Sequence, residues 1–255
     1  MLFHNTTFIG IDPTAGERPI TYVALDNDLQ LLALSKGDLN AVLAFVGGQR
    51  SAFVAINSPR RPNQKLMQRE DIRQKLSPPP IPGRWTNFRV AEYLLYQRNI
   101  RIPHTSAEVE KCPTWMQIGF KLYRRLEKFG YRAFPQDENP QQLLEVYPYA
   151  SYAALLGTLP FKKKTLEGRL QRQVLLHTKA IEVPNAMRIF EEITRHKILQ
   201  GILPLDRLYS AEELDALIAA YTAWLAATTP EKVTRVGNPQ EGEIILPIPA
   251  LEPKY

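Results

Sequence analysis

The sequence predicts an α/β protein in which one sheet lies between layers of helices. Two short segments, Phe8–Asp12 and Ala52–Asn57, are apolar along almost their whole length and do not alternate with polar residues. Continuous apolarity is typical of strands that are covered on both faces. The chain after Pro148 is mainly helical in its apolar spacing, and we expect its helices to provide part of that cover.

The N-terminal quarter alternates strand and helix signals. Ile20–Asp26 and Leu29–Leu34 predict a hairpin joined by an Asn-Asp turn. Leu39–Val46 fits a helix, because Asp38 is a suitable N-cap and two glycines follow the last apolar residue. A further short strand is expected at Leu143–Tyr147, where Pro148 ends it.

The rest of the chain predicts helices separated by proline-marked loops. No linker divides it, so we expect a single domain over residues 1–255 with a helical insertion around residues 60–135. The predicted helices are Lys65–Leu76, Thr86–Tyr96, Thr114–Phe129, Tyr149–Leu156, Leu166–Thr178, Asn185–Gln200 and Ala211–Thr228. A short polar tail that carries Glu243–Leu246 follows them.

The composition is that of an ordinary folded protein. Of 255 residues, 44% are hydrophobic and 23% are charged, which argues against disorder. The net charge of +6 permits nucleic acid as a partner without requiring one. Cys112 is the single cysteine, so no intrachain disulfide forms, as suits a reducing compartment. With no signal-peptide pattern and no long apolar run, we expect a cytoplasmic protein without a membrane partner.

Two carboxylates lie in or at the end of predicted strands. Asp12 ends the first strand, and ligands of open α/β sheets bind at the carboxyl edge of the strands. Glu145 lies inside an otherwise apolar strand, on the same face as Leu143 and Tyr147. A buried carboxylate needs a cation, a hydrogen-bond donor or water. Asp12 and Glu145 are therefore candidate site residues.

A third carboxylate, Asp215, lies at the margin of the apolar face of the helix Ala211–Thr228. Its neighbours on that margin are Ala211, Ala219 and Thr222. Such small side chains allow a helix to approach a sheet closely. An aspartate at this place is a candidate metal ligand.

Seven short motifs follow one another over nearly the whole chain. They are GID (10–12), VAINSP (54–59), RVAEYLL (89–95), EVYP (145–148), KKTLEGRLQR (163–172), LDALIAAYTA (214–223) and EGEIILP (241–247). In this order they resemble an uncharacterised bacterial and archaeal family of predicted nucleases with an RNase H-like fold. The resemblance implies an RNase H-like three-layer fold, in which a mixed five-stranded sheet has helices on both faces.

The resemblance also implies a site. Asp12, Glu145 and Asp215 correspond to the catalytic carboxylates, which with Asn57 would bind Mg²⁺ or Mn²⁺. Asn57 departs from the family pattern, which has a carboxylate there, and offers a neutral carbonyl oxygen. The residues that we expect to bind substrate are Arg60, Arg61, Arg84, Arg89, Lys164 and Arg169.

The function that these residues predict is metal-dependent hydrolysis of phosphodiester bonds in DNA or RNA. A non-catalytic nucleic-acid-binding or scaffold protein is the alternative, because Asn57 removes one negative charge. Phosphotransfer or nucleotide hydrolysis is a third hypothesis, although no phosphate-binding glycine loop occurs. Each carboxylate also has a structural interpretation: Asp12 as a turn cap, Glu145 as the partner of a buried arginine, and Asp215 in a salt bridge at the helix edge.

Overall fold

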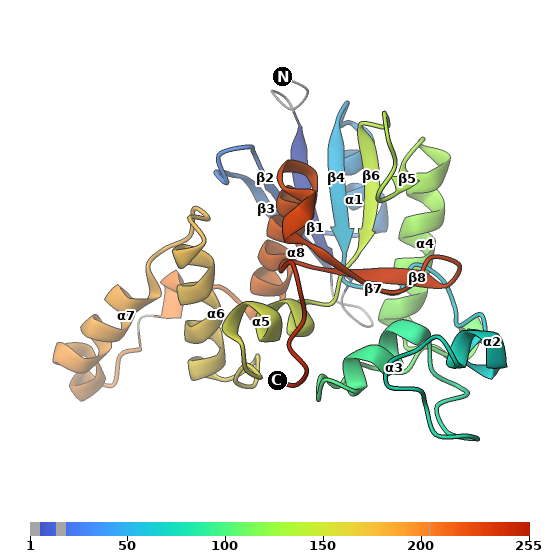
Figure 1. Ribbon diagram of the computed structural model, residues 1–255. Helices are drawn as coiled ribbons and strands as arrows, with labels where there is room; N and C mark the ends of the chain where they lie inside the picture. Colours follow the sequence, from blue (N-terminus) through green and yellow to red (C-terminus); the bar gives the residue numbers. More distant parts are fainter. Residues whose placement is uncertain (1–5, 14–18, 204) are drawn as a thin grey trace.

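The centre of the molecule is a mixed β-sheet with helices on both faces (Figure 1). The computed structural model describes residues 6–13, 19–203 and 205–255. The strands of the described residues are β1 (Thr7–Asp12), β2 (Ile20–Leu25), β3 (Leu31–Gly37), β4 (Ala52–Ile56), β5 (Arg132–Ala133), β6 (Gln141–Glu145), β7 (Thr234–Asn238) and β8 (Gly242–Leu246). Their order is β3-β2-β1-β4-β6-β8-β7, and β5 pairs with β6 beside that path. Strands β1, β4, β6 and β8 are parallel, while β2 and β7 run antiparallel to their neighbours.

Helices cover both faces, which confirms the predicted layer arrangement. The α-helices of the described residues are α1 (Leu39–Gly47), α2 (Glu70–Arg73), α3 (Val90–Tyr96), α4 (Thr114–Lys128), α5 (Pro148–Leu156), α6 (Leu166–Thr178), α7 (Ala186–Glu192) and α8 (Ala211–Thr228). Helices α1 and α4 pack on the face that carries Ile9 and Ile11. Helix α8 packs on the opposite face, with Phe8 and Ala55, and α5 and α6 join the same core there.

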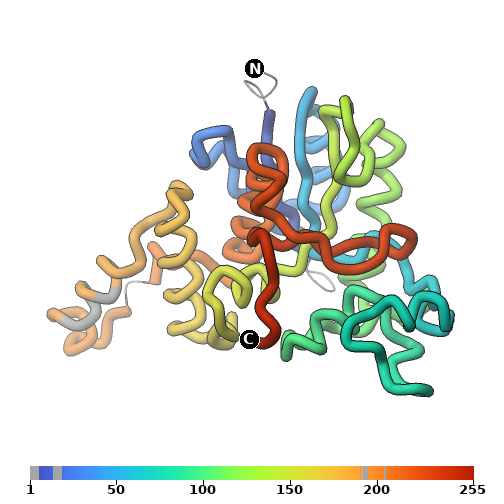
Figure 2. Tube along the Cα trace, viewed as in Figure 1, coloured from blue at the N-terminus to red at the C-terminus, as the bar shows by residue number. Residues whose placement is uncertain are grey.

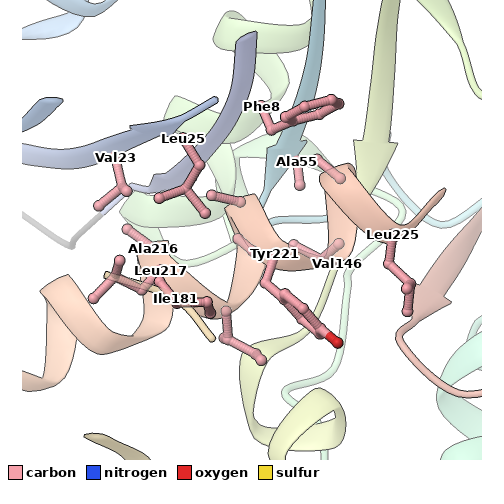
Figure 3. Packing of buried hydrophobic residues seen from close by; sticks show 14 of the residues in the cluster. Phe8, Val23, Leu25, Ala55, Val146, Ile181, Ala216, Leu217, Tyr221 and Leu225 are labelled. Carbon is pink, nitrogen blue, oxygen red and sulfur yellow. The ribbon is translucent and has the colours of Figure 1, made fainter. Parts of the chain in front are cut away.

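The contact between α8 and β1 is unusually close. A Cβ atom at Gly10 would overlap the backbone carbonyl oxygen of Ala216, so only glycine lets the helix axis come this near to the strand. Figure 3 shows the helix beside Phe8, Val23, Leu25 and Ala55 of the sheet, with the Tyr221 ring pointing away from these side chains. The predicted close approach is confirmed, and it sets the distance between the end of β1 and the first turns of α8.

Two helical segments flank the carboxyl ends of β1, β4 and β6. Residues 60–111 contain α2 and α3, and residues 157–207 contain α6 and α7. Figure 2 shows these segments on opposite sides of the strand ends. The carboxyl edge of the central strands therefore lies between two helical segments that come from different parts of the chain.

The five-stranded prediction is wrong in number, because the described residues form eight strands. The five predicted strands are all present, as β1, β2, β3, β4 and β6. The additional strands are β5, with two residues, and the β7–β8 hairpin. Strand β8 joins β6 only through the pair Glu145 and Ile244, so the hairpin diverges from the sheet instead of continuing it.

Three predicted helices are shorter than their apolar spacing suggested. In Lys65–Leu76 only α2 is α-helical, and buried Arg73 donates its guanidinium hydrogens to loop carbonyl groups, including Ile81 O at 2.7 Å. Helix α3 begins four residues late, at Val90, with Arg89 as its N-cap. Residues 185–200 continue beyond α7 in π and 3₁₀ turns.

Candidate active site

Asp12 and Asn57 lie side by side at the carboxyl edge of two parallel strands. Asp12 ends β1 and Asn57 directly follows β4, whose Ile56 pairs with Ile11. The side-chain amide of Asn57 donates a hydrogen bond to Oδ1 of Asp12 at 2.7 Å. Asp12 is 5% exposed, so this bond stabilises a carboxylate that is almost withdrawn from water.

Asp215 approaches the same edge from helix α8. Ser210 caps the helix: its hydroxyl accepts from the backbone N–H of Glu213, whose side chain accepts from the N–H of Ser210. This capping box fixes the first turn, and Asp215 follows in the next. Asp215 is 3% exposed, and its Oδ2 accepts a hydrogen bond from Lys163 Nζ at 2.6 Å.

The three charged groups influence one another strongly. Burial and the neighbouring Asp215 carboxylate raise the pKa of Asp12 to about 7, although Lys163 and Asn57 act in the opposite direction. Burial also raises the pKa of Asp215, against the effect of Lys163. The pKa of Lys163 is raised because the two carboxylates outweigh the effect of its own burial. The site thus holds more negative charge than its single lysine balances.

Glu145 is not part of this group. It lies on β6 one residue before Val146, which faces α8, and two residues after Leu143, which faces α1 and α4. Because side chains alternate along a strand, Glu145 points to the face opposite Asp12. The structure therefore corrects the prediction of a site with three converging carboxylates: it brings together Asp12, Asn57 and Asp215.

Glu145 instead pairs with a buried arginine. Arg89 is fully buried and donates to both carboxylate oxygens, from Nη1 at 2.6 Å and from Nη2 at 2.9 Å. The backbone N–H of Arg60 donates to Oε2 of Glu145 at 3.0 Å. Arg89 Nη2 also bonds the carbonyl oxygens of Glu241 and Gly242. The pair ties β6 to the start of α3 and to the β7–β8 hairpin.

The predicted substrate-binding residues are dispersed. Arg89 has no exposed surface with which to contact a substrate. Arg169 donates to the backbone carbonyl oxygens of Tyr209, at 2.7 Å, and of Leu208, so it links α6 to the segment before α8. Arg60 pairs with Glu127 at 2.6 Å.

Three of the predicted basic residues remain open to solvent. Arg61 is half-buried and bonds the carbonyl oxygen of Gln240 at 3.3 Å. Arg84 and Lys164 are exposed. Lys163, the basic residue that meets the carboxylates, was not among the predicted site residues. Nothing distinguishes it in sequence from the lysines on either side of it in the run 162–164.

The oxygen atoms at this edge fit a hard divalent cation. Two carboxylates and one amide are the donor types that Mg²⁺ and Mn²⁺ prefer. Among the described residues, no donor hydrogen-bonds to Oδ2 of Asp12 or to Oδ1 of Asp215. In that same part of the chain no group of three or more His, Cys, Asp or Glu side chains is placed to hold a metal ion. A cation here would rely on Asn57 as well as on the two aspartates.

The comparisons with known proteins identify a family. In the described part of the chain, no helix has the length and apolarity needed to cross a membrane. Comparisons with curated proteins and with solved structures gave no match. A family model described as "Protein of unknown function (DUF429)" matches residues 51–241, a segment that includes Asn57, Glu145, Lys163 and Asp215. The chain belongs to the DUF429 family of proteins of unknown function.

Proposed function

We propose that this protein is a metal-dependent phosphodiesterase that cleaves DNA or RNA. The observation that carries the proposal is the meeting of two buried aspartates from different elements, with Asn57 beside them, at the carboxyl edge of parallel strands. The strand order β3-β2-β1-β4-β6 with antiparallel β2 supports an RNase H-like fold.

Asp12, Asp215 and the amide oxygen of Asn57 would hold Mg²⁺ or Mn²⁺. Such an ion, when bound, polarises a phosphate group and lowers the pKa of a water molecule. The chain's own residues prepare for this charge. Asn57 holds Oδ1 of Asp12 in place, and burial of both aspartates raises the free energy of their charged forms until a cation is near.

The substrate phosphates would meet basic side chains around the strand edge. Arg61, Arg84 and Lys164 are the predicted residues whose side chains reach solvent, and Lys163 is the one nearest the carboxylates. Phosphate contacts of this kind position a nucleic acid without selecting its sequence. They favour a nuclease of broad sequence range.

The test is cleavage of labelled single-stranded, duplex, hybrid and branched oligonucleotides with Mn²⁺. We expect cleavage by the wild type and at least about 100-fold less by Asp12→Asn and Asp215→Asn. Asp28→Asn is the matched control, because Asp28 is an exposed aspartate in the β2–β3 turn. Absence of cleavage by the wild type, or equal cleavage by Asp12→Asn, would overturn the proposal.

A non-catalytic nucleic-acid-binding protein is the second candidate. Its support is Asn57, together with the ammonium group of Lys163 that already pairs with Asp215. This candidate predicts oligonucleotide binding that weakens with salt but does not depend on Mn²⁺. The same oligonucleotides, measured by fluorescence anisotropy with EDTA and with Mn²⁺, separate the two candidates.

A further inference from the structure

The loop between α5 and α6 holds Lys163 in a defined place. Arg172, which is 1% exposed, donates from Nη1 to the carbonyl oxygens of Phe161 at 2.9 Å and Gly168 at 2.8 Å. A Cβ atom at residue 168 would overlap the carbonyl oxygen of Lys162, so glycine lets the loop lie directly against the helix. The Thr165 hydroxyl donates to the same carbonyl oxygen at 2.9 Å. The backbone on both sides of Lys163 is therefore fixed.

The side chain of Lys163 bridges solvent and the buried carboxylates. It is 41% exposed, whereas the side chain of its partner Asp215 is 5% exposed. Its ammonium group also attracts Asp12, the second-strongest carboxylate partner after Asp215. Lysine combines a compact charge with a flexible four-carbon stem. The loop is thus held while the charged end keeps freedom to move.

The charges at this edge balance with one divalent ion. Counted as two carboxylates and one ammonium group, Asp12, Asp215 and Lys163 carry one net negative charge. A divalent cation changes this to one positive charge, and a phosphodiester group brings the sum to zero. In two-metal enzymes a second cation stabilises the charge that develops on the reacting phosphate. Lys163 is a positive charge already in contact with one of the two carboxylates.

We propose that Lys163 is the second cation of the site. It occupies Asp215 until a divalent ion binds, gives way to that ion, and then contacts the substrate phosphate. Arg172 is a positioning residue that holds the loop. The inference rests on the proposed function, since it assigns the site one divalent ion instead of two.

Binding of Mn²⁺ to the full-length chain, measured by calorimetry and electron paramagnetic resonance, tests this inference without any cleavage assay. We expect one Mn²⁺ per wild-type chain. Lys163→Met should bind Mn²⁺ about tenfold more tightly, because a partly buried ion pair no longer competes for Asp215. Lys162→Met removes the same charge from an exposed neighbour and should leave the affinity within about twofold.

Cleavage with saturating Mn²⁺ adds the second half of the test. Lys163→Met should cleave at least about 100-fold more slowly although it binds the ion better, and Lys163→Arg should recover part of the loss. If Lys163 had a purely structural role, Lys163→Met would lower the Mn²⁺ affinity and the cleavage rate together.

Two Mn²⁺ per wild-type chain, or equal Mn²⁺ affinity in wild type and Lys163→Met, would overturn the inference while the proposed function stands. Tight Mn²⁺ binding by Lys163→Met without cleavage by the wild type would support the competition by Lys163 and remove the proposed function. Circular dichroism of each variant confirms that it is folded before binding is compared.

Discussion

Asn57 donates its side-chain amide to Oδ1 of Asp12 across 2.7 Å. An amide can donate to a buried aspartate and also offer an oxygen to a cation, whereas a second carboxylate can only accept. Asn57 therefore stabilises buried Asp12 when no metal ion is bound. It also brings one negative charge fewer to a metal site than an aspartate at this position would.

Asn57→Asp should make the metal-free protein less stable and increase its stabilisation by Mn²⁺. Without a divalent ion, the new carboxylate replaces a hydrogen-bond donor beside buried Asp12, so we expect the variant to lose about 1–3 kcal/mol of unfolding free energy. Mn²⁺ should then raise its melting temperature more than it raises that of the wild type. Thermal unfolding with EDTA and with Mn²⁺ measures both effects. An equal rise in the two proteins would contradict the assignment of Asn57 to the cation site.

The stability of the metal-free protein should fall as the pH rises. The pKa of Asp12 is 3.8 in an ordinary setting and about 7 here, so the folded state binds the proton more tightly. The stabilisation is present in full below pH 4 and is lost as the pH rises through 7, by up to ~4 kcal/mol. Urea unfolding of wild type and Asp12→Asn at several pH values, with EDTA, measures this loss. Asp12→Asn should show a flatter profile, and Asp28→Asn should retain the wild-type slope.

Breaking the pair of Glu145 and Arg89 should destabilise the fold strongly without affecting the cation site. Glu145→Ala removes the carboxylate that both Nη atoms of the fully buried Arg89 contact, at a cost of about 3–5 kcal/mol. Glu127→Ala is the control, because it breaks the more exposed ion pair of Glu127 with Arg60. It should cost under about 1 kcal/mol. Urea unfolding gives both values. At a temperature where Glu145→Gln is folded, its Mn²⁺ affinity should equal that of the wild type; a large loss of affinity would make Glu145 a ligand after all.

Gly10→Ala should separate α8 from β1. The added methyl group overlaps the backbone of Ala216, so the helix has to move, and Asp215 moves with it. We expect a loss of several kcal/mol and at least about tenfold weaker Mn²⁺ binding. Gly48→Ala is the control, because a Cβ there would lie 3.5 Å from its nearest neighbour. Mn²⁺ binding at wild-type affinity in a folded Gly10→Ala protein would show that this contact does not set the site.

The sequence predicted those features of the fold that depend on the residue pattern within a single strand or helix. Apolar runs predicted the strand that ends at Asp12 and the strand that Asn57 directly follows, and helical spacing predicted the bounds of α6 and α8 as the structure has them. The small residues beside Asp215 predicted a close approach of the helix to the sheet. These features depend on local periodicity, which a sequence carries directly.

The features that the sequence did not predict depend on tertiary packing. Glu145 lies at the expected edge of the sheet, but the face to which it points relative to α8 is set by how the helices cross the sheet. Lys163 reaches Asp215 only because Arg172 and Gly168 fold its loop back. Strand β7 lacks an apolar run, and it forms because β8 provides its partner. None of these relations is encoded in the spacing of neighbouring residues.

The most direct test of the account is a crystal structure of the full-length protein soaked with Mn²⁺, with the ion located by its anomalous scattering. We predict one Mn²⁺ peak bound by Asp12, Asp215 and Asn57, with the Lys163 ammonium moved away from Asp215 and Glu145 still paired with Arg89. A peak bound by Glu145, or carboxylates that stay bare while Lys163 keeps its bond to Asp215, would contradict the account.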